Sequence, residues 1–551
     1  AAKIGDFTSR NTYYLPGETL EKSLVILNDT RRDLTTHFTW SVPEWKISGS
    51  GTVVTKPGGR TDLPISFRIP DNAAGQKATL HARFSYSGNK TAEDTFPIEV
   101  GTPAKVSLKR AVYLVDPEGS AGPLLRKLKI PFRSLRGEKL PEQGILILGR
   151  NALRKAPSSL ENTLRSGLRL LVLEQPYEDL LNLGIRGNVH GFREIFALDP
   201  SFADKPLKNW RGASTNLPHD LETPDYEPQM PKWNWNGFSN TRVWRAGNRG
   251  TVSGVVPEKP CVGDWMPLLQ TGFDLQYAPL LEYREGKSRV LFCQLDVSGR
   301  TEESPEALEL LAEALRYLDR SETPEPRRSF YLGNAAGEEV LKTLKLKYLP
   351  LKEMKQCTER DLLILGPGSK TGSLKELLSK GLHVLALGLD AQEMRKILPG
   401  LEGLSTGKGV YSDYAEGLGD DPVFRGISNA DLHWRKGLSG TFFAKSNPGG
   451  KALRSLSVGK GKIVFCQVAP WMFDPNEFQY RTTRRRNFYL LSRLAHNLGA
   501  ESDSAFLKRL SKRSGLRDGY RSLKGTWLGK ADPKKIGREK GYFRPDFRTD
   551  R

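Results

Sequence analysis

The residue types best suited to ligand chemistry gather in one stretch of fifteen residues. It contains Trp233, Trp235, Trp244, Arg242 and Arg245, together with one phenylalanine and three asparagines. Aromatic faces stack on the C–H surfaces of sugar rings, while amides and guanidinium groups reach hydroxyls. The composition predicts a carbohydrate-contacting surface. The alternative is that these tryptophans anchor a long insertion to its own domain.

A tryptophan–arginine pair occurs in two further places, Trp210-Arg211 and Trp434-Arg435. The two pairs lie in comparable regions of an internal repeat described below, although their offsets from the preceding aspartates differ. A cation over an aromatic ring is a common structural contact. We interpret both pairs chiefly as structural tryptophans beneath arginines, and we keep them as further candidates for carbohydrate contact.

Motifs for catalysis, metals and cofactors are missing from the sequence. The four cysteines are widely spaced, without a CxxC motif, and the seven histidines form no HxH or i, i+4 pair. There is no GxxxxGK[ST] loop, and no predicted strand is followed by GxGxxG. A pair of carboxylates for glycoside hydrolysis cannot be chosen among 63 acidic residues. We therefore predict no metal or cofactor site and assign no catalytic residue.

The net charge of +21 raises the question of an acidic partner. Residues 501–551 carry 15 Lys or Arg against 7 Asp or Glu, a net charge of +8 (15 − 7). Basic residues interleaved with Tyr520 and Trp527 suit nucleic acid, but no known nucleic-acid motif accompanies them. A solvated basic surface is the favoured interpretation. No run approaches the 18 apolar residues of a membrane-spanning helix.

The elements that must position any site begin with an all-β module over residues 1–103. Short alternating runs such as Ser23–Leu27, Thr36–Trp40 and Leu80–Tyr86 are separated by turn clusters such as Leu15–Glu18. About seven strands in about 100 residues is the size of an immunoglobulin-like sandwich.

From about residue 104 the pattern changes to buried strands alternating with amphipathic helices, and it occurs twice. The matching segments are Arg110–Val115 with Arg328–Gly333, Ile145–Gly149 with Leu362–Gly366, Ser166–Leu173 with Ser379–Leu387, and Arg289–Leu295 with Lys462–Val468. Continuous apolar strands predict parallel sheets covered by helices on both faces, the doubly wound α/β class.

The predicted organisation is thus multidomain. The sandwich is followed by two tandem α/β domains, 104–320 with the aromatic insertion and 327–500, joined by a Pro-rich charged linker. A basic linker, 501–523, and a partial β segment, 524–551, complete the chain.

The two α/β domains resemble the class I glutamine amidotransferases, which are flavodoxin-like in layout. In that family a cysteine occupies a sharp turn between a strand and a helix. The corresponding turns here are Leu173–Pro176 and Leu387–Asp390, and neither has a nucleophile. Cys293 and Cys466 fall inside apolar strands, so we expect buried thiols.

Further segments resemble accessory modules of large bacterial glycoside hydrolase family 2 (β-galactosidase-like) proteins. Leu15–Thr30 resembles the immunoglobulin-like module that follows their catalytic barrel, and Gly541–Phe547 resembles the start of a sugar-binding jelly roll. Trp233–Arg245, Phe273–Tyr277 and Leu281–Gly286 are similar to the long insertion of those proteins. Degenerate amidotransferase-like domains also accompany family 42 β-galactosidases, where their role is structural or oligomeric.

The resemblance implies a non-catalytic accessory part of a carbohydrate-degrading protein. The partners it implies are a catalytic (β/α)8 barrel of the same polypeptide and an oligosaccharide or polysaccharide, and it leaves a homo-oligomer open. It favours a periplasmic or extracellular location. The main alternative is a module that binds an anionic polysaccharide. A nucleic-acid-binding protein and an active glutamine amidotransferase are less favoured.

Overall fold

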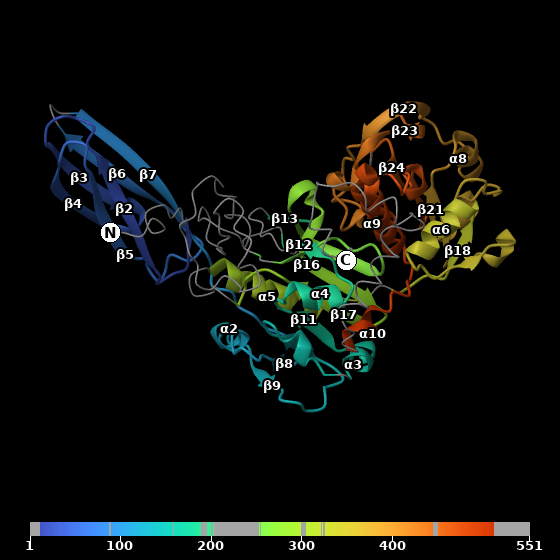
Figure 1. The fold of residues 1–551 in the computed structure, drawn as a ribbon, viewed down its shortest axis with the longest axis horizontal. Coiled ribbons are helices and arrows are strands. Elements are labelled where there is room, and N and C mark those ends of the chain that lie inside the picture. Colours follow the sequence, from blue (N-terminus) through green and yellow to red (C-terminus); the bar gives the residue numbers. More distant parts are fainter. Residues whose placement is uncertain are drawn as a thin grey trace.

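The computed structural model describes residues 12–86, 90–157, 159–188, 195–199, 202, 253, 255–298, 305–320, 322, 325–444 and 450–511. Figure 1 shows a β-sandwich at one end, followed by two units in which helices cover a sheet. We call these the first α/β unit (residues 112–320) and the second α/β unit (residues 329–497). The chain is thus a multidomain, mixed β and α protein. The predicted β segment 524–551 lies outside the described residues.

Seven strands build the sandwich. They are β1 (Tyr13–Tyr14), β2 (Thr19–Leu27), β3 (Leu34–Val42), β4 (Ile47–Thr55), β5 (Arg60–Arg68), β6 (Lys77–Tyr86) and β7 (Lys90–Val100). One sheet has the order β1-β7-β6-β3-β4, and β2 pairs with β5 in the other. Alternate residues, such as Ala78, Leu80 and Ala82 of β6, are buried. The polar–apolar alternation of the sequence therefore places one face of each sheet in a shared core.

The first α/β unit is built around one mixed sheet. Its elements are β8 (Val112–Val115), α2 (Ala121–Lys127), β9 (Phe132–Ser134), β10 (Ile145–Leu148), α3 (Leu160–Ser166), β11 (Arg169–Val172), α4 (Tyr177–Asn182), β12 (Gly187–Asn188), β13 (Ile195–Ala197), β14 (Val256–Pro257), β15 (Asp264–Thr271), β16 (Tyr277–Glu285), β17 (Ser288–Cys293) and α5 (Pro305–Arg320). The sheet order is β13-β15-β16-β17-β11-β10-β8-β9, and the five strands from β17 to β9 are parallel. Strands β13, β15 and β16 are antiparallel and extend the parallel sheet beyond β17.

The second α/β unit repeats this plan without the long extension. Its elements are β18 (Ser329–Leu332), α6 (Ala335–Thr343), β19 (Leu349–Pro350), β20 (Leu362–Leu365), α7 (Lys375–Lys380), β21 (His383–Leu387), α8 (Ala391–Ile397), β22 (Leu404–Ser412), β23 (His433–Phe443), β24 (Leu453–Val458), β25 (Gly461–Cys466) and α9 (Arg481–Asn497). The sheet order β19-β18-β20-β21-β25-β24 matches β9-β8-β10-β11-β17-β16 strand for strand. In both units the last strand of this series is antiparallel to its neighbour.

Strand registers test the predicted repeat residue by residue. Arg169 pairs with Arg289 in the first unit, and His383 pairs with Lys462 in the second. The predicted match of the segment starting at Arg289 with the segment starting at Lys462 is confirmed, because both residues occupy the same place in the register.

The predicted match of the first strands is wrong by one residue. It aligned Val112 with Phe330, but Val112 pairs with Ile145 and Ser329 pairs with Leu362. Val112 therefore corresponds to Ser329. Side chains alternate between the two faces of a strand, so a shift of one residue exchanges the faces. The two segments have similar residues at neighbouring positions, so the sequence alone does not show the shift.

Helices cover both faces of each sheet. In the first unit α2 and α5 lie on one face, while α3 and α4 lie on the other. Helix α5 buries Leu308, Leu311, Leu315 and Leu318, which share one side of a helix. In the second unit α6 and α9 cover one face, and α7 and α8 the other.

After the second unit the chain returns to the first. Helix α10 (Phe506–Ser511) lies beside α3 (Figure 1), and its Phe506, Leu507 and Leu510 are buried. The ring of Phe506 is 4.4 Å from that of Tyr283 and 4.7 Å from that of Trp265, centroid to centroid. This corrects the prediction of a solvated linker over 501–523 for its described part. Helix α10 is amphipathic: its basic residues lie beside an apolar face that packs on the first unit.

We expect Phe506→Ala to lower the free energy of unfolding of the first unit by about 3–5 kcal/mol, because it leaves a cavity among aromatic rings. Urea unfolding measures the change. Lys508→Ala, an exposed change on the same helix, is the control and should cost less than about 0.5 kcal/mol. Equal effects of the two substitutions would contradict the docking of α10.

Candidate functional site

The densest cluster of charged side chains lies where the two α/β units meet. We call this contact the seam. It joins β15, β16 and residues 258–259 of the first unit to α9 and residues 425–435 of the second. In Figure 1 α9 lies on the side of the second unit that faces the first.

Helix α9 has an unusual charge distribution for a buried helix. Arg484, Arg485 and Arg486 stand in its second turn, no acidic residue stands in its first turn, and no side chain caps its amino end. The amino end of a helix carries a partial positive charge, which favours nearby anions and disfavours cations. The sequence of α9 therefore requires acidic groups from elsewhere in the fold.

The first unit supplies those acids. Glu258 forms an ion pair with Arg485, and Asp274 lies 3.1 Å from Arg486. Further along the helix, Arg493 lies 2.7 Å from Asp264. All three carboxylates cross the seam to reach α9.

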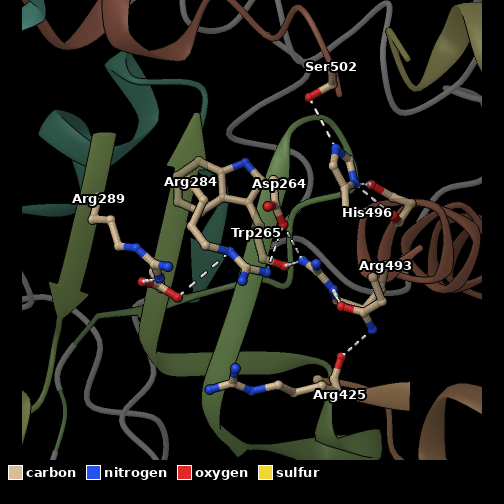
Figure 2. A network of polar contacts seen from close by, with 12 residues as sticks. Asp264, Trp265, Arg284, Arg289, Arg425, Arg493, His496 and Ser502 are labelled. Carbon is tan, nitrogen blue, oxygen red and sulfur yellow. Dashed lines mark hydrogen bonds and ion pairs between the residues drawn. The ribbon is translucent and has the colours of Figure 1, made fainter. Parts of the chain in front are cut away.

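Asp264 is the centre of an alternating charge network (Figure 2). Its Oδ1 lies 2.7 Å from Arg493 and 3.1 Å from Arg284. Arg284 lies 3.9 Å from Glu282, which in turn lies 2.6 Å from Arg289. Arg493 and Arg289 are 1% and 2% exposed, and Glu282 is fully buried. The network thus runs from the interior of the first sheet into the second unit.

The electrostatics of the network follow from this geometry. Burial by itself would raise the pKa of Asp264, but Arg284 and Arg493 outweigh it and hold the pKa well below its usual range. Burial, reinforced by Arg493 and Arg284, lowers the pKa of His496 to about 4. His496 is therefore neutral near pH 7. Its Nδ1 lies 2.7 Å from the Ser492 carbonyl, and its Nε2 lies 3.3 Å from the Ser502 hydroxyl.

A second buried pair crosses the seam in the opposite sense. Lys259 of the first unit lies 3.2 Å from both carboxylate oxygens of Asp431 in the second, and both side chains are almost fully buried. The Lys259 ammonium also donates to Gln270 and lies over the ring of Tyr489. Each unit therefore contributes both a cation and a carboxylate to the ion pairs that cross the seam.

Close backbone approach accompanies the ion pairs. A Cβ on Gly426 would lie 2.8 Å from Met266 Sδ and 3.1 Å from Arg493 Cδ, and the φ of Gly426 is +80°. The carbonyl of Gly426 accepts a hydrogen bond from the Tyr489 hydroxyl. Only glycine fits this position without moving its neighbours.

Doubly wound domains bind ligands at the carboxyl ends of their central strands. Here glutamine side chains form hydrogen bonds to the backbone at those ends. Gln175 stands in the turn between β11 and α4. Its amide donates to the Gly149 and Leu173 carbonyls and accepts from the Leu153 N–H. In the second unit Gln467 donates to the carbonyls of Leu389 and Thr441. These amides join strand ends instead of facing a substrate.

The thiols are placed for packing. Cys261, Cys293, Cys357 and Cys466 are free and buried. Burial raises the pKa of each to about 12, which keeps the thiols protonated near pH 7. Within the described part of the chain, no group of three or more His, Cys, Asp or Glu residues could hold a metal ion. No helix in that part is long and apolar enough to cross a membrane.

Most of the carbohydrate-contact candidates from the sequence lie outside the described residues. These are Trp210, Arg211, Trp233, Trp235, Arg242, Trp244 and Arg245. Their contact with carbohydrate stays a prediction.

The structure describes the remaining pair. Trp434 is 2% exposed, and its indole N–H donates to the Val410 carbonyl at 2.7 Å. Arg435 is half exposed and lies 3.7 Å from Asp274 across the seam. Trp434 is therefore buried while Arg435 points toward the seam, so the two side chains do not form one shared surface for a ligand.

Sequence reasoning did not single out the seam residues. The one available signal is the run Arg484-Arg485-Arg486 at the start of a predicted helix, where cations oppose the helix dipole. Asp264 and Lys259 gave no signal, because their partners belong to the other unit.

No protein-family model and no curated protein matches the chain. Some solved structures are similar to parts of it. The sporulation control protein of Bacillus subtilis is 17% identical, with 16% of this chain and 46% of its own covered and a TM-score of 0.11. A β-glucuronidase of Bacteroides uniformis is 10% identical, with 29% and 26% covered and a TM-score of 0.13.

A cycloisomaltooligosaccharide glucanotransferase of Paenibacillus is 10% identical, with 74% of this chain and 54% of its own covered and a TM-score of 0.15. Distant structural neighbours thus include carbohydrate-active enzymes.

We expect the stability of the protein to fall between pH 6.5 and pH 4 because of His496. The folded-state pKa of about 4 is below the ordinary value of about 6.5. In this window the unfolded chain binds a proton that the folded chain excludes, so stability is lost as the pH falls. His496→Gln should flatten this dependence in urea unfolding. His37→Gln, at an exposed site in the sandwich, should keep the wild-type slope, and equal slopes for all three proteins would contradict the prediction.

Proposed function

We propose that the chain is a non-catalytic, structural part of a glycoside hydrolase family 2-type protein that acts in carbohydrate degradation. Its role is to hold accessory modules in a fixed arrangement beside a catalytic barrel of the same polypeptide. The observation that carries the proposal is the seam, in which buried ion pairs join the two α/β units. The carbohydrate context rests on the resemblance of the sequence segments described above.

The seam has the properties of a rigid joint. Buried ion pairs add little net stability, but they are strongly destabilising when one partner is removed. The geometry that satisfies them is therefore the one that persists. Arg493 meets both the Asp264 carboxylate and the Trp265 carbonyl, each at 2.7 Å. A sliding motion of the units would separate this buried arginine from both of these partners and leave only its bond to Asn497.

The sandwich is docked as well. The Tyr13 hydroxyl donates to Glu309 on α5, and Tyr13 is 3% exposed. Burial and the Glu309 carboxylate both raise the pKa of this tyrosine, so it stays protonated as a donor. The sandwich is thus tied to the final helix of the first unit.

The proposed domain identities are an immunoglobulin-like sandwich and two amidotransferase-like domains. Numbered within each unit, the parallel strands have the order 2-1-3-4-5, which is the flavodoxin-like order. The turns after β11 and β21 contain no Ser, Cys or Thr. Gln175 fills the first turn with three hydrogen bonds, which supports a structural role for a domain that has lost its nucleophile.

We expect a narrow distance distribution between spin labels on the two units if the chain acts as a brace. Lys127→Cys on α2 and Lys396→Cys on α8 introduce exposed attachment points, and the four native thiols are buried. Pulsed electron resonance should show one distance. Adding Asp264→Asn should broaden it, because Arg493 and Arg284 then lose their shared carboxylate.

The exposed pair Arg60–Asp62 in the sandwich offers a matched control. Asp62→Asn should leave the distance distribution unchanged. A broad distribution in the otherwise wild-type protein would show that the units move freely, and the bracing role would be withdrawn.

We expect no turnover by the chain alone. Neither a chromogenic galactoside or glucuronide nor glutamine should be hydrolysed above the buffer rate, because the described turns after β11 and β21 hold no Ser, Cys or Thr. Absorbance and ammonia release measure this, with a known β-galactosidase and a known glutaminase as positive controls. A rate that disappears when one acidic residue within 104–500 is substituted would make the chain an enzyme.

A further inference from the structure

A small pocket opens on the seam, between the two α/β units. Its lining comes from both of them: Glu258, Lys259, Gln276, Asp431, Thr482, Arg485, Arg486 and Tyr489. The pocket is partly open to solvent, and its enclosed space is that of about one water molecule, so a larger group can enter only from the open side.

The pocket is rich in cationic groups even after the ion pairs are counted. Lys259 is held by Asp431, while Asp274 is shared between Arg486 and Arg435. Among the lining residues, Lys259, Arg485 and Arg486 are cations and Glu258 and Asp431 are carboxylates, so the lining has one more cation than carboxylates.

Arg486 has one donor, its Nε, that no described residue engages. Its side chain is more than nine-tenths buried, and its Nη1 donates to the His433 carbonyl at 2.8 Å. Its Nη2 forms an ion pair with Asp274 at 3.1 Å, and its Nε has no hydrogen-bond partner among the described residues. Buried donors of this kind usually have a partner. An acceptor in the pocket would provide one.

The start of α9 adds further donors. Thr482 lies in the first turn of α9 and lines the pocket, and its hydroxyl bonds to none of the described residues. The partial positive charge of the helix end lies beside its hydroxyl, as it does in many anion sites. The carboxylates of the lining do not cancel this charge, because Glu258 is engaged by Arg485 and Asp431 by Lys259.

Burial and neighbouring cations both lower the pKa values of the basic residues in the lining. Burial lowers the pKa of Lys259, and Arg486 adds to the lowering that Asp431 opposes. Burial also lowers the pKa of Arg485 to about 10, with Glu258 opposing and Arg186 adding to the effect. An anion would relieve the repulsion among these cations.

We propose that the pocket binds one small oxyanion group, a sulfate, phosphate or carboxylate, with Arg486 and Thr482 as its donors. Bound between the units, the anion stabilises the seam by mass action. The group is either a free inorganic ion or the charged substituent of an acidic saccharide. The site is independent of the proposed bracing role, and either can fail without the other.

Isothermal titration with sodium sulfate, in a sodium fluoride background of constant ionic strength, tests the site. We expect saturable one-to-one binding. Arg486→Gln should weaken it about tenfold or more, as expected for one charge-assisted hydrogen bond. Arg395→Gln, an exposed change on α8 of the second unit, should bind as the wild type does.

Because Arg486→Gln also removes a partner of Asp274, Thr482→Val is the second variant. It removes only a hydroxyl that has no structural bond, and it too should weaken sulfate binding. Heat that never saturates, or wild-type affinity in both variants, would overturn the site.

Competition identifies the source of the anion. Sodium glucuronate that displaces sulfate shows that the carboxylate of an acidic sugar fits. Failure of glucuronate to displace bound sulfate restricts the site to inorganic ions, and either result supports an oxyanion pocket. Displacement by neutral glucose would show that charge is not what the pocket recognises, and the proposal would be rejected.

Discussion

The arrangement of the two α/β units depends on one requirement: the arginine-rich amino end of α9 must be buried beside acidic groups. Arg485 and Arg486 are each less than one-tenth exposed. Buried guanidinium groups need counter-charges, since desolvating an ion is costly unless it is paired. Helix α9 has no acid in its own first turn, and acids of the first unit, Glu258 and Asp274, pair with Arg485 and Arg486. Further along the helix, Asp264 of the antiparallel extension pairs with Arg493.

The two units are copies that differ where they dock. Arg169 and His383 occupy equivalent strand positions, and each contacts a carbonyl at the end of its unit's final helix, Leu318 or Leu498. The outer sides of those helices have diverged. Acidic Glu309 of α5 meets Tyr13 of the sandwich, whereas basic α9 meets the acids of the first unit. In both cases the final helix of a unit contacts the module that comes before that unit in the chain: α5 contacts the sandwich, and α9 contacts the first unit.

Local patterns in the sequence predicted the elements well, because burial and periodicity act over a few residues. Runs such as Ile145–Leu148 and Leu362–Leu365 are strands buried on both faces, as continuous apolar letters indicate. Patterns were less informative for register and docking. The one-residue shift between Val112 and Ser329 shows only in backbone pairing, and the apolar face of α10 needed the aromatic cluster around Trp265 to explain it.

The sequence by itself determined the repeated order of strands and helices, the burial of Cys293 and Cys466, and the lack of a nucleophile at the turn that Gln175 occupies. Each of these depends on residues that are close together in the chain. Only the tertiary structure decided where the charges meet. Trp265, whose carbonyl Arg493 binds, is 228 positions from that arginine, and the pocket beside α9 draws its lining from both units. Ionic contacts between units depend on distance in space, and one sequence with many charged residues does not show which of them become neighbours.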